Sequence, residues 1–434
     1  MTPRGLSRRH LLGAAAGTAA GALLAACGLS RDGALGDGTG EIMVWTWPDN
    51  DRTFLETIPA FERKFPKIKV NVQGFSGAFG GSYNTKVLGA LVSGSGPDVA
   101  MVEITSVSNF ASKPGFVDLK KPPFNAGEVA DKYADFSWKY VADQNSGRIF
   151  ALPKNTGPGG MFYRRDVFEQ AGLPTEPDDV HEALEDWPTF VEQGRKVAKK
   201  GERWLLDAPD TLIRVLQAQN GVSYFDESGQ PQLDSDVVVD ALEFAIGLQK
   251  DGLLAPDMSS QERGAAINAG NIVTFLSGNW FGGLIKAQYA PDSAGKWGVA
   301  LAPATNGVSA FNYGGDFIGV LQSSRNQLAA WEFCKWVTQD SESLDAMYQR
   351  DLYPAWKTAW QEPWINKPDP FYANQNVNTV FSEVSATMKP PVTNPNDTIA
   401  NTALSTAVND VVHNVRSVRD ALARAQADVE GKLA

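Results

Sequence analysis

The chain has 434 residues, of which 43% are hydrophobic and 21% charged, a composition typical of a globular protein long enough for two or three domains. Its formal net charge of −11 makes it a poor candidate for binding nucleic acid or an anionic lipid surface. Two cysteines and three histidines, far apart in sequence, offer little for a His/Cys metal site or for histidine-dependent catalysis. The chain has no Walker-type loop and no dinucleotide-binding glycine motif, so no cofactor is expected.

The first 26 residues, 1–26, have the layout of an export signal. A basic head with Arg8 and Arg9 precedes an apolar run, rich in glycine and alanine, from Leu11 to Ala26. This run is short for a membrane-spanning helix, and its composition is typical of a signal peptide. The paired arginines resemble a twin-arginine signal, so both this route and the general secretory route stay open.

Cys27 stands directly after this signal, in the sequence Leu-Ala-Ala-Cys. It resembles the lipobox of bacterial lipoproteins, in which the chain is cut before the cysteine and the thiol carries a diacylglycerol. A plain secretory peptide with an incidental cysteine is the alternative. Acyl chains contribute about 0.8 kcal/mol per buried methylene, so lipid on Cys27 would hold the protein at the outer face of the cell membrane. The polar, glycine-rich residues 27–40 are typical of a flexible tether.

Beyond the tether, apolar patterns predict alternating strands and helices. Strands are expected over 41–47, 67–75 and 97–104, with helices over 52–66 and 84–94 between them. This is the βαβ rhythm of a parallel sheet with helices on its faces.

The alternation recurs in the rest of the chain. Extended segments are expected at 148–155, 159–165, 271–280, 296–304 and 310–324. Helices are expected at 165–173, 187–201, 237–252, 327–339 and 403–429, the last as one or two helices.

Twelve tryptophans are many for this length. Four of them fall on helix or strand patterns and are expected in the core: Trp187, Trp297, Trp331 and Trp336. Packing alone is not the obvious account of the rest. Sugar rings stack on aromatic faces and their hydroxyls need polar partners, so an exported, acidic, tryptophan-rich chain fits contact with carbohydrate.

The order of segments resembles a known family, the solute-binding proteins of bacterial carbohydrate ABC transporters, the class that includes maltose-binding protein. The matching pieces include AFERKFPKIKV, LVSGSGPDV, LPKNTGPGGMFYRRDVFEQAGL and GNIVTFLSGNW, and they run in family order from about residue 41 to 340. The resemblance implies an α/β, periplasmic-binding-protein-like fold, with two α/β lobes joined by three hinge crossovers and a ligand cleft between the lobes. It also implies a monomer that closes around its ligand and is read by the permease subunits of the transporter.

Mapped onto this chain, the resemblance implies a division into two discontinuous lobes. The first lobe would hold 41–156 plus 303–338, and the second 157–302 plus 339–434. The hinges would fall near Thr156-Gly157, Ala302-Pro303 and Thr338.

Polar and aromatic residues follow the predicted strands where a ligand crevice is expected. Trp47, Asp49 and Asn50 come after the first strand, and Glu103 ends the third. Loops at the carboxyl ends of strands face the crevice of an α/β lobe, so these side chains are predicted to contact ligand. A turn-forming Asp-Asn pair is the alternative for the first group.

The resemblance implies further ligand contacts. Trp280 matches a position where the family stacks an aromatic ring on sugar, and Asn155 lies at the first crossover, where this chain departs from the acidic residue of many relatives. The remaining candidates are Phe79 on a cleft loop with Phe75, Asp210 near Arg214, the glycine-broken stretch with Tyr313, Gly315 and Asp316, and Tyr353 and Trp356 on the second-lobe wall.

The sequence thus predicts a lipid-anchored, extracytoplasmic protein that binds a sugar, in particular an oligosaccharide, delivers it to an ABC permease and catalyses nothing. Two alternatives stay open. One is a cell-surface carbohydrate-active enzyme, since 50 acidic residues always permit some catalytic pair. The other is the same fold binding a phosphorylated polyol, which would want several Arg or Lys in the cleft.

Overall fold

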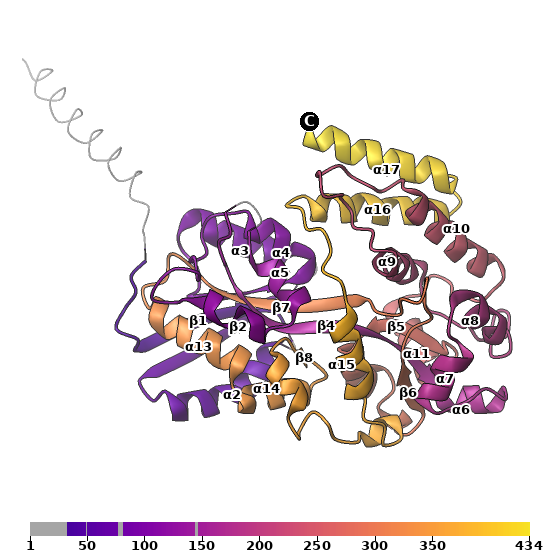
Figure 1. The fold of residues 1–434 in the computed structure, drawn as a ribbon, viewed down its shortest axis with the longest axis horizontal. Coiled ribbons are helices and arrows are strands. Elements are labelled where there is room, and N and C mark those ends of the chain that lie inside the picture. Colours follow the sequence, from indigo (N-terminus) through magenta and orange to yellow (C-terminus); the bar gives the residue numbers. More distant parts are fainter. Residues whose placement is uncertain (1–32, 49, 77–80, 144–145) are drawn as a thin grey trace, which may run out of the picture.

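The two lobes lie side by side along the longest axis of the molecule (Figure 1). The computed structural model describes residues 33–48, 50–76, 81–143 and 146–434. Among the predicted functional residues, Cys27, Asp49 and Phe79 lie outside these ranges. In Figure 1 the first lobe is mainly indigo and purple, and the second runs from magenta to yellow.

The sheet of the first lobe begins with parallel strands, as the alternation of patterns predicts. β1 (Gly40–Thr46) pairs in parallel with β2 (Ile68–Gly74) on one side and with β3 (Val99–Glu103) on the other. The helices α2 (Asn50–Lys64) and α3 (Ser82–Ser93) make the return connections. Parallel neighbours need such crossovers, so the ends of β1 and β3 face the same edge of the sheet.

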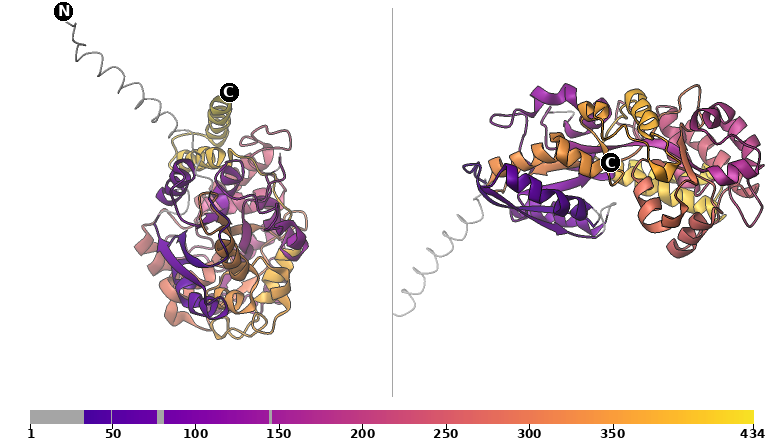
Figure 2. Two further views of the ribbon diagram at one scale, coloured as in Figure 1. Left: turned by 90° about the vertical axis from the view of Figure 1, so that its left-hand side faces the viewer. Right: turned by 90° about the horizontal axis from the view of Figure 1, so that it is seen from below.

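Two long strands continue from the first lobe into the second. β4 (Leu152–Arg164) pairs antiparallel with β7 (Asn312–Val320) in its first half, and with β5 (Thr274–Gly278) and β6 (Trp297–Ala300) in its second half. The right-hand view of Figure 2 shows strands passing from one lobe to the other. The two extended segments predicted on either side of residue 157 are therefore one strand, because the pairing with β7 runs past that point.

The sheet is mixed rather than wholly parallel. β7 lies between β3 and β4 and is antiparallel to both, in the order β2-β1-β3-β7-β4-β5. A short strand, β8 (Tyr353–Pro354), adds to the other side of β4 at residues 155 and 156. The parallel βαβ arrangement predicted for residues 41–104 is confirmed by β1, β2 and β3, and the antiparallel strands come from later in the chain.

Helices cover both lobes. In the first lobe these are α2, α3, α4 (Ile104–Ala111), α5 (Asp135–Val141), α13 (Gln327–Gln339) and α14 (Ser341–Tyr348). In the second lobe they are α6 (Arg165–Gln170), α7 (Pro177–Ala183), α8 (Trp187–Gly194), α9 (Pro209–Gln219), α10 (Asp236–Lys250), α11 (Ser260–Ala269), α12 (Phe281–Leu284), α15 (Asn378–Thr387), α16 (Asp397–Val412) and α17 (Val418–Leu433). The shorter helical turns are η1 (Ala126–Lys132), η2 (Ile285–Tyr289), η3 (Pro291–Ser293), η4 (Lys357–Gln361) and η5 (Pro370–Tyr372).

The buried side chains form separate cores. One gathers residues between 42 and 152 with residues 317–337 and Ala355, and another gathers residues between 161 and 311 with the C-terminal helices. The four tryptophans predicted in the core are buried, at 0–6% exposure, which confirms that prediction. Cys334, the free cysteine among the described residues, is also fully buried, which raises the pKa of its thiol.

Helix α14 lies on the first lobe, although the expected division gave its residues to the second. Ion pairs hold it there: Lys64 Nζ of α2 lies 2.5 Å from Asp340 Oδ2, and Arg63 lies 3.1 Å from Glu342. The helix also follows α13 directly, with Asp340 capping its first turn. The chain therefore stays on the first lobe beyond Thr338, because these charges face each other across α2 and α14.

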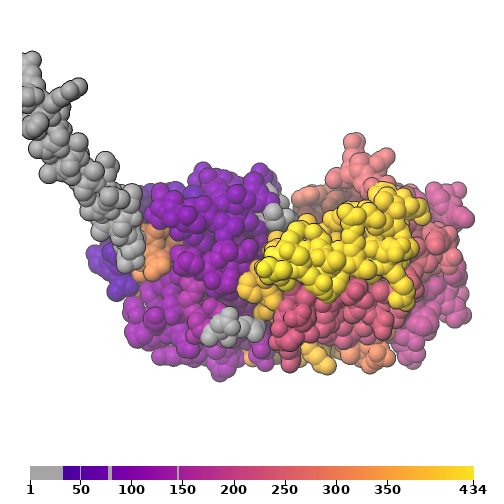
Figure 3. Space-filling model, turned by 90° about the horizontal axis from the view of Figure 1, so that it is seen from above, coloured from indigo at the N-terminus to yellow at the C-terminus, as the bar shows by residue number. Residues whose placement is uncertain are grey.

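The two lobes also touch through α4 and α16. Ser108 Oγ donates to Asp397 Oδ2 at 2.9 Å, and Thr398 Oγ1 donates to the carbonyl of Thr105 at 3.2 Å. Figure 3 shows the C-terminal segment, in yellow, reaching the purple surface of the first lobe. The lobes are thus linked both by the long strands β4 and β7 and by these hydrogen bonds between α4 and α16.

We expect Gly157→Ala to lower the free energy of unfolding by about 1–3 kcal/mol. A Cβ at residue 157 would lie 2.7 Å from the Cα of Gly314, where β4 and β7 pass each other. The atom that the added Cβ meets belongs to the backbone, so a change of side-chain rotamer cannot relieve the clash. Urea denaturation of the purified protein measures the change.

The matched control is Gly247→Ala in α10, where an added Cβ meets nothing within 4 Å. Alanine is favoured over glycine in a helix by about 1 kcal/mol, so this variant should be as stable as the parent or more so. Equal effects of the two substitutions would contradict a special constraint at the strand crossing.

Candidate functional site

A group of polar side chains meets where three strands of the first lobe lie side by side. Glu103 ends β3 opposite Asp316 of β7, and Asp316 in turn pairs with Asn155 of β4. Their exposed fractions are 4%, 7% and 2%. The register of the strands therefore brings together three residues that are 52 and 161 positions apart in sequence (155 − 103 = 52; 316 − 155 = 161).

Two further side chains complete this group, which we call the strand-end cluster: Asn50, Glu103, Lys154, Asn155 and Asp316. Lys154 Nζ donates to Asn50 Oδ1 at 2.8 Å, and both residues are buried. Burial lowers the pKa of Lys154 to about 8, and burial raises the pKa of Asp316 against the charge of Lys154. The cluster thus holds opposite charges in a desolvated position.

Glu103 also caps a helix. Its side chain accepts hydrogen bonds from the backbone N–H and from the hydroxyl of Thr105 at the start of α4. Burial raises its pKa from 4.5 to about 7, although the bonds from Thr105 work in the opposite direction. In its ionised form this buried carboxyl group lacks the hydration that it would have in water. It therefore favours a partner that can donate hydrogen bonds to it.

A guanidinium of the second lobe lies across from this carboxylate. Arg214 of α9 donates to Asn401 Oδ1 at 2.6 Å and to the hydroxyl of Tyr224 at 3.3 Å. Burial opposes its charge, but negative groups around it, Asp210 and Glu103 among them, raise its pKa. The charges of Glu103 and Arg214 therefore interact across the lobes, while no ion pair within 4 Å joins these two described residues.

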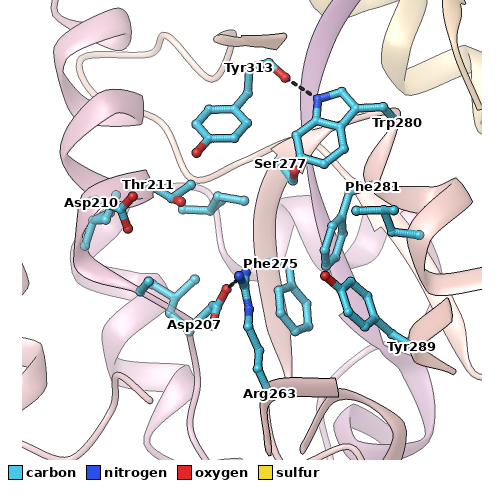
Figure 4. Close-up of a pocket in the computed structure, with 15 residues that line it drawn as sticks. Asp207, Asp210, Thr211, Arg263, Phe275, Ser277, Trp280, Phe281, Tyr289 and Tyr313 are labelled. Atoms are coloured by element: carbon cyan, nitrogen blue, oxygen red, sulfur yellow. Dashed lines mark hydrogen bonds and ion pairs between the residues drawn. The ribbon is translucent and has the colours of Figure 1, made fainter. Parts of the chain in front are cut away.

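The second lobe contains a pocket of about 190 Å³ (Figure 4), lined in part by Asp210 and Thr211 of α9, the helix that also carries Arg214. Its polar lining comes from the loop before α9, from α9, α11 and β5, and its aromatic lining comes from β5, the start of α12, η2 and β7. The lining includes Asp207, Asp210, Arg263, Ser277, Trp280 and Tyr313. Tyr313 of the pocket lining and Asp316 of the strand-end cluster lie three residues apart on β7, so the pocket and the cluster are neighbours.

Trp280 and Tyr313 form the aromatic side of the pocket. Their rings are stacked, with centroids 6.1 Å apart and planes 20° apart, and the indole Nε1 donates to the Tyr313 carbonyl at 2.5 Å. Room for the indole depends on two glycines, because a Cβ at Gly278 or Gly314 would lie 2.6 or 2.7 Å from Nε1. The backbone of β5 and β7 thus fixes the position of the tryptophan ring.

At the other end of the pocket a carboxylate and a guanidinium meet. Arg263 of α11 donates to Asp207, which stands before α9, and Figure 4 shows the pair facing into the pocket. Burial raises the pKa of Asp207 in spite of Arg263. The pocket therefore offers aromatic rings along its wall, and charged hydrogen-bond donors and acceptors at the end where Asp207 and Arg263 meet.

The structure brings together many, but not all, of the side chains that the sequence suggested. Asn50, Glu103, Asn155 and Asp316 lie in the strand-end cluster, beside Gly315 with its φ of +136°. Asp210, Trp280 and Tyr313 line the pocket. Trp47 is only 7% exposed and packs edge-on against Tyr83 at 5.5 Å, so its ring belongs to the first-lobe core.

Tyr353 and Trp356, predicted on the second-lobe wall, are not among the residues that line this pocket. Tyr353 is fully buried, and its hydroxyl donates to Asn378 Oδ1 at 2.6 Å. Trp356 packs against Tyr133 of the first lobe, with ring centroids 4.8 Å apart. The reason is that β8 pairs with β4, which draws both aromatic rings into the contacts behind the sheet.

Sequence reasoning missed Asp207, Arg263 and Ser277. Asp207 stands in the same stretch as Asp210, after the buried Leu205 and Leu206, so the rule about strand ends could have found it. Arg263 lies on the helix α11, and nothing in the sequence around it distinguishes it from an ordinary surface charge. Among the described residues no group of three or more His, Cys, Asp or Glu could hold a metal ion, and no helix there is long and apolar enough to cross a membrane.

Comparisons with known proteins agree with this geometry. The profile of a family described as bacterial extracellular solute-binding protein matches residues 45–342. A lactose-binding protein of Rhizobium radiobacter is 28% identical over 364 residues, covering 79% of this chain and 82% of that protein. An arabinooligosaccharide-binding protein of Halalkalibacterium halodurans is 23% identical over 415 residues, covering 92% and 90%.

Solved structures show the same fold. A family 1 extracellular solute-binding protein has a TM-score of 0.78 at 21% identity, covering 90% of this chain and 99% of the other. The binding protein of an ABC transporter from B. animalis subsp. lactis, in complex with β-1,6-galactobiose, has a TM-score of 0.74 at 23% identity, covering 90% and 96%. These likenesses confirm the expected two-lobed α/β fold.

The raised pKa of Glu103 predicts a pH dependence of stability. The folded protein holds the proton to a higher pH than the unfolded chain, so this group's contribution to stability is present at low pH. That contribution falls as the pH rises from 4.5 through about 7. Relative to Glu103→Gln, which has no proton to lose, the parent should lose at least about 1 kcal/mol between about pH 5 and about pH 8.

Urea denaturation of both proteins at each pH measures this difference, and Glu182→Gln on the surface of α7 serves as the control. A constant difference in stability between the parent and Glu103→Gln across this range would show that Glu103 does not titrate in the desolvated position described above.

Proposed function

Because the chain belongs to the family of bacterial extracellular solute-binding proteins, we propose that it binds a sugar, in particular an oligosaccharide, and delivers it to an ABC transporter permease. The family is described as solute-binding proteins, and one solved relative is a binding protein in complex with β-1,6-galactobiose. We therefore infer that the chain binds its ligand and catalyses no reaction on it.

The observation that carries the sugar proposal is the pocket with Trp280 and Tyr313 on one side and carboxylates on the other. A sugar presents flat C–H faces to aromatic rings and hydroxyls to charged partners. Charge-assisted hydrogen bonds contribute about 1.5–3 kcal/mol each, and stacking on aromatic rings contributes on the order of 1–3 kcal/mol. Relatives that are named for lactose and for arabinooligosaccharide support this class of ligand.

Partners from both lobes support binding with closure. Asn155 Oδ1 is buried without a hydrogen-bond partner in the strand-end cluster, and Arg214 faces Glu103 from the second lobe. A buried acceptor without a partner is costly, so a ligand hydroxyl in this position would contribute directly to affinity. We propose that the lobes, with boundaries near residues 156 and 302, rotate about β4 and β7 and close on the ligand.

We further propose that lipid on Cys27 anchors the protein at the outer face of the membrane and that it acts as a monomer. The support is the sequence Leu-Ala-Ala-Cys after an export signal, with a tether up to residue 40. The second cysteine, Cys334, is buried in the first-lobe core and is not a competing site for the lipid.

Trp280→Ala should weaken sugar binding about 5- to 150-fold, since the stacking it removes is worth on the order of 1–3 kcal/mol. Isothermal titration of the purified protein with lactose, arabino-oligosaccharides and β-1,6-galactobiose measures the loss. Trp364→Ala, a partly buried tryptophan outside the pocket, is the matched control and should bind as the parent does.

Two results would contradict the proposal. Stabilisation of the fold by glycerol phosphate and by no sugar would favour the phosphorylated-polyol alternative. Steady release of a cleaved product from any of these saccharides would favour the enzyme alternative.

Cys27→Ser should release the protein from the membrane fraction of cells that express it. An acyl chain contributes about 0.8 kcal/mol per buried methylene, and no such anchor can form on the variant. Fractionation and detergent partitioning of the full chain measure the location. Cys334→Ser serves as the control and should stay with the membrane, and equal partitioning of parent and Cys27→Ser would refute the anchor.

A further inference from the structure

The end of the pocket away from Trp280 is occupied by a charged pair with unused hydrogen-bonding capacity. Arg263 reaches Asp207 through one terminal nitrogen, and its Nε is buried without a hydrogen-bond partner. The Asp207 side chain is 15% exposed and that of Arg263 is 40% exposed. The pair is therefore accessible from the pocket and only partly satisfied by its own contacts.

Charge in the pocket lining is unbalanced. Asp207 and Asp210 supply two carboxylates against the one guanidinium of Arg263, while Arg214, which lies behind the lining, is shared with Glu103. A carboxylate or phosphate on a ligand would meet a guanidinium that Asp207 already neutralises, and it would be repelled by both aspartates. An anion thus gains little in this pocket and loses its hydration on entry.

A neutral sugar ring matches the same pair well. A hydroxyl can donate and accept at once, whereas a carboxylate only accepts. Two neighbouring hydroxyls can therefore donate to Asp207 and accept from Arg263 together. The volume of about 190 Å³ is on the scale of one ring, so further rings of an oligosaccharide would extend toward the strand-end cluster.

We propose that the Asp207–Arg263 pair makes this pocket selective for an uncharged sugar ring, and that Asp207 is the residue that excludes acidic sugars. This inference rests on the proposed sugar-binding function. Arg263 positions the ring through its hydroxyls, and Asp207 both holds Arg263 and repels an acidic group on the ligand.

The test uses matched neutral and acidic probes: galactose with galacturonic acid, and lactose with lactobionic acid. Isothermal titration of the purified protein gives the ratio of the two dissociation constants. The parent should bind the neutral member at least tenfold more tightly. Asp207→Asn should reduce this preference at least tenfold, because it removes a charge that repels the acid and frees the guanidinium to bind it. Added salt should reduce the affinity for the acid that this variant gains.

Two variants separate selectivity from loss of structure. Arg263→Gln should weaken binding of the neutral sugar and gain no affinity for the acid. Asp251→Asn breaks an exposed pair with Arg195 in the same lobe and should leave the ratio unchanged. If Asp207→Asn fails to fold, Asp207→Glu keeps the charge and should keep the preference, while Arg263→Gln still tests the role of the guanidinium.

The outcomes distinguish this inference from the function on which it rests. Binding of neutral sugars with equal affinity for the acids, or with a ratio that Asp207→Asn leaves unchanged, overturns the charge selectivity and leaves sugar binding in place. Failure of every saccharide to bind overturns both.

Discussion

The antiparallel pairing of β4 with β7 is the constraint on which the rest of the molecule depends. Each strand has one end in each lobe, so a single ladder of hydrogen bonds holds two separate cores in register. A slip of one residue would turn every side chain to the opposite face of the sheet. The close approach of Gly157 to Gly314 lies in this ladder, beside register shifts in β4.

The site is built on the same two strands. Asp316 of β7 lies in the strand-end cluster of the first lobe, while Tyr313, three residues before it, holds Trp280 over the pocket of the second lobe. A rotation of the lobes about these strands would therefore move the aromatic side of the pocket relative to the polar cluster. Ligand contacts on both sides then favour one arrangement of the lobes over others.

The contact between α4 and α16 adds a second link close to the same cluster. Glu103 caps α4, and Ser108 on that helix donates to Asp397 at the start of α16. Burial raises the pKa of Asp397 to about 6, which reflects how little water reaches this position between the lobes. Glu103 of the strand-end cluster and a side chain that joins the lobes are thus neighbours on one short helix.

The sequence by itself determined the local elements of the fold, and it predicted an export signal and a set of candidate ligand contacts. Apolar periodicity marked the strands and helices of the first lobe, because burial of one face repeats every two or 3.6 residues. The rule that crevices lie at strand ends suggested Glu103 and Asn50, the resemblance suggested Trp280, and the glycine-broken stretch suggested Asp316. These features depend on short stretches of chain.

Only the tertiary structure decided which distant side chains meet. That β4 is one strand in both lobes, that β8 draws Tyr353 and Trp356 away from the pocket, and that Arg263 faces Asp207 all depend on contacts between residues far apart in sequence. Periodicity reports which face of a helix or strand is buried, but it carries no information about which residues pack against that face. The register of the strands and the packing of helices on the sheet decide those contacts, and with them which side chains of the candidate site lie together.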